Sequence, residues 1–350
     1  MNEFANARTL IRPPDGEAAS EAAALQARLT KPAGSLGRIE SLGIQLSEIA
    51  AVVPPPYPSP VAVAVFAADH GVHAQGVPPW AKEVTAQMVA NFLSGGAAIN
   101  VFARQIGATV TVVDVGVAGS LDAAPGLLDH KVRMGTADLS IEAAMGAEEV
   151  RAALDVGALV AGELVANGAR CLVTGEMGIA NTTASAAVIA ALTGRPPAEV
   201  TGRGTGIDDA TLERKVAAIE RGLARLGVDR DPLTVLAEVG GLEIAALAGF
   251  IVGGAAERVP VLVDGVIAGA ALLVAQALEP GVVGCCIAGH RSVEPGAGAV
   301  LEHLGLEPVL DLGMRLGEGS GACLAWAVVD AAARVMNEMA TFDAAGVVEK

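Results

Sequence analysis

The chain has 350 residues, of which 52% are hydrophobic, 3% aromatic and 43 glycine, and its formal net charge is −16 at pH 7. Such an acidic chain lacks the basic stripe that nucleic-acid binding needs, so we expect no nucleic-acid partner. The longest apolar stretch, Gly265–Leu278, is too short to span a bilayer and the N-terminus lacks a signal-peptide pattern, so we predict a cytoplasmic protein without membrane contact.

The two ends of the chain are predicted to lie outside the main fold. A chain of this length exceeds the size at which one core usually keeps growing, which favours a large domain with a smaller satellite. The segment to about residue 25 and the last helix, from about Ser320 to Met339, have the pattern of helical packing. We therefore predict a large α/β catalytic domain at 26–319 and a small helical domain made of 1–25 and 320–350.

Short apolar runs alternate with Ala-rich helical patterns through the middle of the chain. Strands that are apolar on both faces indicate a sheet covered on both sides, and the alternation predicts βαβ units with a parallel sheet. The predicted strands are Val61–Ala67, Thr109–Val115, Arg170–Thr174, Pro260–Val263, Val282–Ala288 and Glu307–Leu310. The clearest helical patterns are Glu83–Phe92, Ala147–Ala166, Asp208–Leu226 and Gly240–Gly253.

Polar and glycine residues gather in the loops that follow the predicted strands. Ligands of such sheets bind outside the carboxyl ends of the strands, so a binding site is expected among these loops. They comprise Ala68–Gly71, Gly175–Gly178, Asp264–Gly265, Gly289–Ser292 and Asp311–Gly321.

The loop after the third predicted strand has two interpretations. Asn181, Thr182 and Thr183 are good capping residues for a helix start that follows the glycine turn Gly175–Gly178. The free amides of that helix start would bind an anion. An ordinary capped helix with nothing bound is an equally good interpretation, and the spacing alone does not decide between them.

A second glycine-rich turn, Gly202–Asp208, leads into a helix that carries Lys215. Glycines permit close approach of the backbone to a ligand, and a nearby lysine supplies a positive charge suited to phosphate. By itself, a flexible turn beside a solvated lysine is the commoner structure. The turn matches neither the GxxxxGK[ST] loop nor the GxGxxG fingerprint of dinucleotide binding.

One carboxylate, Glu318, lies among glycines just before the last apolar helix. It is either the acidic residue that a helix N-terminus favours or a general base in a pocket where burial raises its proton affinity. The pair Asp69–His70 invites a metal interpretation, but a loop hydrogen bond is more common. The four cysteines and the histidines have no metal-site spacing, so we expect no metal, and the cysteines are predicted to be buried thiols.

These motifs, in this order, resemble those of the nicotinate-nucleotide–dimethylbenzimidazole phosphoribosyltransferase family of cobalamin lower-loop assembly. Each motif alone is weak, but together they run through nearly the whole chain. They are Leu29–Arg38, Ala68–Val72, Glu83–Met88, Gly175–Ile179, Gly202–Gly206, Asp264–Gly265, Gly289–Ser292 and Arg315–Gly321.

The resemblance implies a Rossmann-like, mostly parallel six-stranded sheet with helices on both faces and a small helical domain built from both chain ends. It also implies a homodimer with no metal and no organic cofactor. The implied reaction transfers the 5-phosphoribosyl group of nicotinate mononucleotide to 5,6-dimethylbenzimidazole or a related base. The products would be α-ribazole 5′-phosphate and nicotinate.

The resemblance also assigns roles to residues. It implies that Glu318 is the catalytic base and that Glu176 lies at the ribose and phosphate end of the pocket. It implies that Lys215 and the turns around Gly178 and Gly204 hold the phosphate. Gln87 is expected beside the benzimidazole, and further substrate contacts are expected from Trp80, Met177, Ile179, Asp264, Leu316 and Gly317.

The chain departs from the family pattern at two places. Ala180 stands where many members have glycine, which puts a methyl group where the backbone is expected to approach the ligand. Pro78–Trp80 stands where some relatives carry smaller polar residues and tyrosine beside the base. The preferred base, whether benzimidazole, purine or phenol, is therefore left open.

Two other classes of protein are weighed against this one. An NAD-dependent oxidoreductase would need GxGxxG after the first strand, and the motif is absent there. A non-catalytic nucleotide-binding protein would keep the glycine turns without needing Glu318. The combination of Glu318, Glu176 and Lys215 favours an enzyme, and whether His70, His290 or Arg291 contacts substrate stays open.

Overall fold

The protein is described by a computed structural model that covers residues 2–204 and 206–348. Thr205 of the second glycine-rich turn and the terminal residues 1, 349 and 350 of the predicted small domain lie outside the described residues. A six-stranded sheet forms the centre of the fold, in the order β3-β2-β1-β4-β5-β6, and every neighbouring pair is parallel. The strands are β1 Val61–Ala68, β2 Thr109–Gly116, β3 Leu127–Asp129, β4 Cys171–Met177, β5 Val261–Val263 and β6 Cys286–Ala288.

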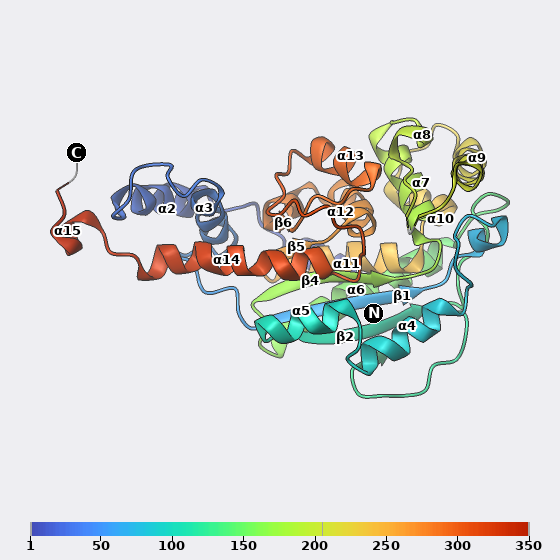
Figure 1. Cartoon of the computed structure of the whole chain (residues 1–350), viewed down its shortest axis with the longest axis horizontal. Coiled ribbons are helices and arrows are strands. Elements are labelled where there is room, and N and C mark those ends of the chain that lie inside the picture. The colour runs from blue at the N-terminus through green and yellow to red at the C-terminus, as the bar shows by residue number, and fades with distance from the viewer. Residues whose placement is uncertain (1, 205, 349–350) are drawn as a thin grey trace.

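Helices cover both faces of this sheet (Figure 1). Strand β1 is buried at every position, and its alternate residues contribute to two separate apolar clusters. Ala64 and Phe66 pack toward α6, α7, α11 and α12, whereas Val63 and Val65 pack toward α4, α5 and α14. The prediction of an α/β fold with helices on both faces is therefore confirmed.

The helices have the following bounds. In chain order they are α1 Glu3–Leu10, α2 Gly16–Arg28, α3 Arg38–Ala50, α4 Val84–Leu93, α5 Ala98–Ile106, α6 Ala147–Ala166, α7 Asn181–Thr193, α8 Pro197–Val200, α9 Asp209–Leu226, α10 Pro232–Val239, α11 Leu242–Ala256, α12 Val266–Leu278, α13 Pro295–Leu304, α14 Ser320–Glu338 and α15 Phe342–Ala345. Two 3₁₀ turns, Gly71–Gln75 and Pro280–Cys285, join them. The four helical patterns taken from the sequence are confirmed as α4, α6, α9 and α11.

The sixth predicted strand, Glu307–Leu310, is wrong. This segment runs beside β6 but forms only one bridge, between His290 and Leu310. Pro308 has no backbone N–H to donate, which weakens a ladder at that point. The sixth strand is β3, whose three residues are too short for a period-two pattern to reveal, and the first part of the predicted strand Val282–Ala288 is a 3₁₀ turn.

Helix α14 starts at the carboxyl edge of the sheet and extends away from it, and α2 and α3 lie beside its far part (Figure 1). Helix α2 packs on α3 and α3 packs on α14, and Leu29 forms a β-bridge with Thr341. Helix α1 lies instead on α6 and α11, where the backbone N–H of Phe4 donates to Asp155 at 2.9 Å. The division into two domains at residues 25 and 320 stays a prediction.

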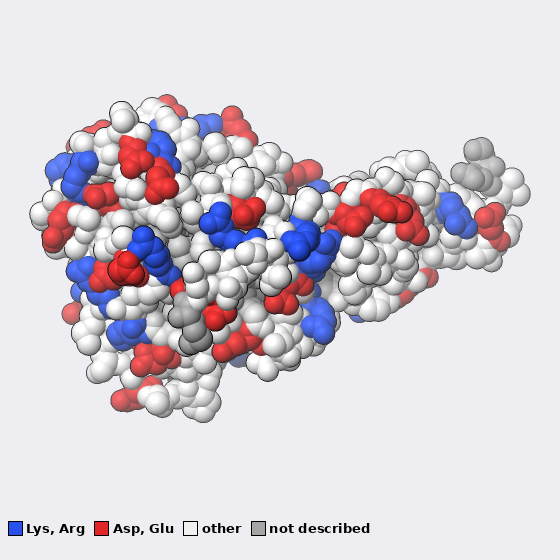
Figure 2. All heavy atoms as spheres, turned by 180° about the vertical axis from the view of Figure 1, so that it is seen from behind, with Lys and Arg blue, Asp and Glu red and all other residues white. Residues whose placement is uncertain are grey.

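Charged side chains of both signs are mixed on the face of the molecule shown in Figure 2. Acidic side chains form a row along the narrow end of the molecule on this face. No helix among the described residues is long and apolar enough to cross a membrane.

Candidate active site

A cavity of about 400 Å³ opens at the carboxyl ends of β4, β5 and β6. The turn after β4, the starts of α4, α7 and α12, and the loop before α14 form its wall. The residues that line it are Trp80, Val84, Met88, Glu176, Met177, Gly178, Ile179, Asn181, Thr182, Gly204, Gly265, Val266, Ile267, His290, Ser292, Glu294, Arg315, Leu316, Gly317 and Glu318. The cavity thus lies where the sequence predicted a site.

Two buried glutamates, Glu176 and Glu318, line this cavity. The backbone N–H of Glu318 donates to Oε1 of Glu176 at 3.3 Å, and the amide of Asn181 donates to Oε2. Burial raises the pKa of Glu176 to about 8, with further increases from the charges of Asp264 and Glu243, against the lowering effect of the two hydrogen bonds. The pKa of Glu176 therefore lies above the usual range of a glutamate carboxyl group.

Glu318 is held in an unusual backbone conformation. Its φ is +65°, between Gly317 at +86° and Gly319 at +91°. A left-handed conformation costs a residue with a side chain about 1–2 kcal/mol, and such strain concentrates at functional sites. The conformation turns the side chain so that Oε2 accepts from the backbone N–H of Ile99, at the start of α5, at 3.2 Å. Burial raises the pKa of Glu318, the Ile99 hydrogen bond lowers it, and the charge of Asp264 raises it.

Two features of the structure require glycine at position 317: the positive φ of its backbone and the closeness of the Glu176 side chain. A Cβ atom on Gly317 would lie 2.2 Å from Oε1 of Glu176. Any side chain there would displace the Glu176 carboxyl group or the turn that carries Glu318. The glycines of this loop therefore set the distance between the two acids.

The opposite end of the cavity carries positive charge. Lys215, buried on α9, donates from Nζ to Oγ1 of Thr182 at 2.9 Å and to the carbonyl oxygen of Gly202 at 3.0 Å. Burial lowers the pKa of Lys215 to about 8, while the charge of Glu294 raises it. Thr182 and Gly204 line the cavity in front of this lysine. A lysine behind a glycine turn and a helix start is suited to holding a phosphate group.

The turn after β4 approaches the backbone of β1 closely. A Cβ on Gly178 would lie 2.4 Å from the carbonyl oxygen of Ala68, so only glycine fits there. The next amide, of Ile179, donates to Oγ1 of Thr85 at 3.1 Å. Ala180 has a φ of +78°, a conformation that favours glycine, whereas its neighbours Ile179 and Asn181 line the cavity. A glycine at this position would therefore relieve backbone strain, whether or not the backbone contacts a ligand.

The third part of the cavity wall is apolar. Trp80, Val84, Met88 and Leu316 provide it, and 53% of Trp80 is exposed at the mouth. An aromatic heterocycle is the kind of ligand that such a wall accepts. Gln87, which was expected beside the base, is exposed on α4, one residue before the lining residue Met88.

Most of the predicted site residues meet in this cavity. Its lining includes Trp80, Glu176, Met177, Gly178, Ile179, Gly204, Leu316, Gly317 and Glu318. Lys215 supports the wall from behind. Asp264, expected as a substrate ligand, is buried and accepts hydrogen bonds from Gly319 and Ala322 instead.

Sequence reasoning missed several polar residues of the region. His70 Nε2 lies 2.6 Å from Oε1 of Glu243 in a fully buried pair, and the His70 ring packs under Gly178. Glu243 is a lone carboxylate in the otherwise apolar helix α11, a signal that would have identified it. His290 and Ser292, which line the cavity, belong to the loop that the sequence singled out without assigning roles, and the lining residue Glu294 follows that loop.

The described residues contain no candidate metal site. Within residues 2–204 and 206–348, no group of three or more His, Cys, Asp or Glu side chains is placed to hold a metal ion. The four cysteines are buried and unpaired with one another, as predicted.

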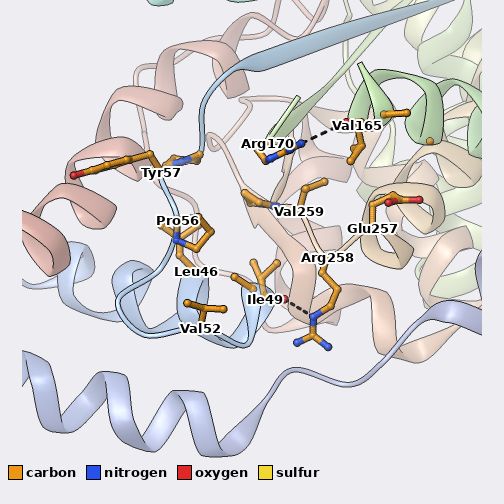
Figure 3. A pocket seen from close by; sticks show the side chains of 15 residues that line it. Leu46, Ile49, Val52, Pro56, Tyr57, Val165, Arg170, Glu257, Arg258 and Val259 are labelled. Carbon is orange, nitrogen blue, oxygen red and sulfur yellow. Dashed lines mark hydrogen bonds between the residues drawn. The ribbon is translucent and has the colours of Figure 1, made fainter. Parts of the chain in front are cut away.

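A second cavity, of about 570 Å³, lies at the amino ends of the strands (Figure 3). The end of α3, the segment before β1, and the ends of α6 and α11 enclose it. Its two arginines donate to backbone carbonyl oxygens: Arg170 to Ala169 at 2.8 Å, and Arg258 to Ile49 at 2.9 Å and Glu48 at 3.1 Å. Despite its larger volume, this cavity lacks the paired acids and the glycine turns, so the carboxyl-end cavity is the candidate site.

Known proteins resemble this chain over nearly its full length. A sequence model described as phosphoribosyltransferase matches residues 11–347. Nicotinate-nucleotide–dimethylbenzimidazole phosphoribosyltransferases of Salinispora tropica and Chloroflexus aggregans are each 57% identical, over 355 and 341 residues, covering 97% of this chain and 98% and 96% of the relatives. Two crystal structures from Thermus thermophilus superpose closely. One, of the enzyme of the same name, has a TM-score of 0.92 and 46% identity and covers 96% of this chain and 100% of the other. The other, of CobT, has a TM-score of 0.93 and 48% identity and covers 95% and 100%.

Proposed function

This chain belongs to the nicotinate-nucleotide–dimethylbenzimidazole phosphoribosyltransferase family, and from that membership we propose how its carboxyl-end cavity performs the family's reaction. The enzyme, a pentosyltransferase, moves the 5-phosphoribosyl group of nicotinate mononucleotide to 5,6-dimethylbenzimidazole. The products are α-ribazole 5′-phosphate, used in the cobalamin lower loop, and nicotinate.

The two ends of the cavity receive different parts of the substrates. The phosphate lies against Thr182 and Gly204, where Lys215 supplies a positive charge and the start of α7 supplies amides. The benzimidazole lies against the apolar wall of Trp80, Val84 and Met88. This arrangement leaves the ribose between them, beside the two acids.

The chemistry needs one proton acceptor. One ring nitrogen of the benzimidazole attacks C1′ as the bond from C1′ to the nicotinate nitrogen breaks, and that electron pair returns to the pyridine ring. The leaving group departs with an uncharged ring and needs no proton. The other benzimidazole nitrogen loses its proton to the carboxylate of Glu318, and displacement from the opposite face converts the β-nucleotide into an α-riboside.

Glu176 stabilises the positive charge that the substrate carries and that develops during the reaction. The mononucleotide carries a pyridinium ring, and positive charge develops on the ribose as the bond to nicotinate breaks. A cation in the cavity favours the ionised form of Glu176, against the burial that raises its pKa to about 8. The Glu176 carboxylate then stabilises the transition state, held in place by Asn181 and by the backbone of Glu318.

The observation that carries this proposal is the pair of buried acids held beside a phosphate-binding wall. Its test is the rate of nicotinate release from nicotinate mononucleotide with 5,6-dimethylbenzimidazole, for wild type and Glu318→Gln. We expect an α-linked nucleotide from wild type and a loss of about 10²–10⁴-fold in the variant, the usual contribution of a general base.

Glu257→Gln is the matched control, because Glu257 lines the amino-end cavity and should leave the rate unchanged. A wild type that binds the mononucleotide but makes no product with a panel of bases would indicate a nucleotide-binding protein instead. Equal rates for wild type and Glu318→Gln would refute the role of Glu318 and leave the function standing.

We also propose a cytoplasmic homodimer with no nucleic-acid partner, in which the chain ends form a small helical domain. Buried, unpaired cysteines fit a reducing compartment, and the net charge of −16 disfavours nucleic acid.

Exposed Trp80, Leu312 and Leu316 near the cavity mouth support a partner copy that covers them. Sedimentation equilibrium should give twice the chain mass, and a monomer at all concentrations would refute the dimer.

A further inference from the structure

Asp264 was expected to bind substrate, but the structure points to another role. We propose that Asp264 is a positioning residue that holds the Glu318 turn in its strained conformation and sets the charge around it. This inference rests on the proposed function of Glu318 as the base. The Asp264 side chain is 1% exposed. It lies behind the cavity wall, whereas Glu318 is part of that wall.

The carboxylate of Asp264 holds the backbone on the far side of Glu318. Oδ2 accepts from the N–H of Gly319 at 3.3 Å, and Oδ1 accepts from the N–H of Ala322 at 2.9 Å. These are amides at the start of α14, which a carboxylate satisfies better than a neutral acceptor does. Both carboxylate oxygens of Asp264 thus accept hydrogen bonds from the segment that follows Glu318.

Asp264 is itself fixed to the sheet. Its backbone N–H donates to Oγ1 of Thr174 at 3.0 Å, and that hydroxyl donates to the carbonyl oxygen of Leu262 at 3.2 Å. Thr174 belongs to β4 and Leu262 to β5. The position of α14 relative to the sheet is therefore transmitted through Asp264 to Glu318.

The turn needs such a restraint. Gly317, Glu318 and Gly319 have three successive positive φ angles, and Glu318 alone of these carries a side chain. A conformation of this kind persists only when its surroundings hold it. Without the bonds from Asp264, Gly319 and Ala322 are free to relax, and the Glu318 carboxylate would leave its position at the start of α5.

Asp264 also contributes charge. It raises the pKa of Glu318 and of Glu176, in each case after the larger effect of burial. Other ionisable groups surround these acids. They include Glu243 from α11, His70 after β1, His290 after β6, Lys215 from α9, Cys323 from α14, and Glu294 and Arg315 from the cavity wall. Removing the Asp264 charge should lower the pKa of Glu318. The base works only when ionised, so the acid limb of the rate profile should move to lower pH.

The test is Asp264→Asn in the full-length enzyme, with kcat, both KM values and the pH profile measured. Asparagine keeps one acceptor oxygen but turns the other into an NH₂ group that cannot accept from an amide. We expect kcat to fall about 10–100-fold, as for a small misplacement of a catalytic group, with both KM values nearly unchanged. The acid limb should move to lower pH, because the charge of Asp264 raises the pKa of Glu318.

Asp114→Asn is the matched control. Asp114 lies at the end of β2, is buried, and accepts from the amides of Gly116 at 3.1 Å and Val117 at 2.9 Å. Like Asp264, it is a buried carboxylate that accepts from two backbone amides, but it lies on another strand, and its Oδ2 pairs with Lys131 at 2.9 Å. This variant should unfold at a lower temperature and keep the wild-type pH profile.

Three results would overturn the inference. A raised KM for the mononucleotide at unchanged kcat would make Asp264 a substrate ligand, and a loss of activity with the acid limb unmoved would make it merely structural. If Asp264→Asn does not fold, Thr174→Val is the deciding variant, because it removes the anchor of Asp264 and leaves the Asp264 carboxylate in the chain. We expect Thr174→Val to lower kcat by a smaller factor than Asp264→Asn and to keep both KM values. A wild-type kcat in Thr174→Val would refute the inference. A wild type that makes no nucleotide would refute the proposed function itself.

Discussion

The sheet has a cavity at each end of its strands, about 400 Å³ at the carboxyl end and about 570 Å³ at the amino end. Helices start at the carboxyl-end cavity and end at the amino-end cavity. The starts of α7 and α12 line the carboxyl-end cavity, whereas the ends of α3 and α6 line the amino-end cavity (Figures 1 and 3). The two cavities therefore differ in the sign of the helix-dipole potential that they experience.

This difference explains how each cavity uses its charged residues. At the amino end, Arg170 and Arg258 donate to carbonyl oxygens that helices and turns leave free. At the carboxyl end, free amides attract anions, and the structure can bury acids such as Glu318 beside them. Volume does not distinguish a catalytic site from a structural gap, whereas the partners of the buried charges do.

The largest expected effect comes from filling the space between the two acids. Gly317→Ala would place a Cβ 2.2 Å from Glu176 Oε1, so we expect kcat to fall by about 10²-fold or more through misplacement of both acids. Gly313→Ala is the control in the same loop, because Gly313 also has a positive φ but open space around its Cα. Equal kcat values for the two variants would show that backbone strain, and not the spacing of the acids, limits the reaction.

A second effect should follow from the lysine at the phosphate end. Lys215 is positively charged below its pKa of about 8 and neutral above it, so kcat/KM for the mononucleotide should fall as pH rises through 8. The fall should approach tenfold for each pH unit above 8. Lys215→Arg keeps its charge at all these pH values and should flatten this alkaline limb. An unchanged limb in that variant would assign the titration to a group other than Lys215.

Breaking the amino-end cavity should affect folding and leave turnover unchanged. Arg258→Ala removes the two hydrogen bonds to the end of α3, and the Glu48 carbonyl then keeps its bond from the N–H of Asp15. We expect the free energy of unfolding to drop by about 1–3 kcal/mol in denaturant titrations, with kcat and KM at wild-type values. A raised KM would contradict the assignment of this cavity to structure alone.

The smallest expected effect concerns two alanines with positive φ, one near each cavity. Ala180 precedes α7 at +78°, and Ala51 ends α3 at +52° beside the amino-end cavity. Replacing either by glycine should stabilise the protein by about 0.5–1 kcal/mol, the strain relieved less the entropy that glycine loses. Both variants should keep the wild-type KM. If Ala180→Gly alone lowers the KM for the mononucleotide, the Ala180 methyl group touches the phosphate.

The sequence predicted those parts of the fold that depend on local pattern. The apolar runs at Val61–Ala67 and Thr109–Val115 became β1 and β2, and the helical period at 147–166 matched α6 in full. Leu127–Asp129 was missed because three residues cannot show a period, and Glu307–Leu310 was overpredicted because apolar content hides the missing donor of Pro308.

The candidate site could be located from the sequence, but its internal geometry could not. Glycine-rich loops after strands pointed to the right edge of the sheet, since strand ends converge there. That Asp264 faces the start of α14, or that Glu318 has a positive φ, depends on how segments far apart in the chain pack together. The pairing of His70 with Glu243, 173 positions apart, is likewise a consequence of tertiary structure.

The position of bound nicotinate mononucleotide in a crystal of this enzyme tests the comparison of the two cavities most directly. We predict that its phosphate lies within hydrogen-bonding distance of Lys215 and Thr182, with C1′ facing Glu318. A nucleotide bound instead against Arg170 and Arg258 at the amino ends of the strands would contradict the account.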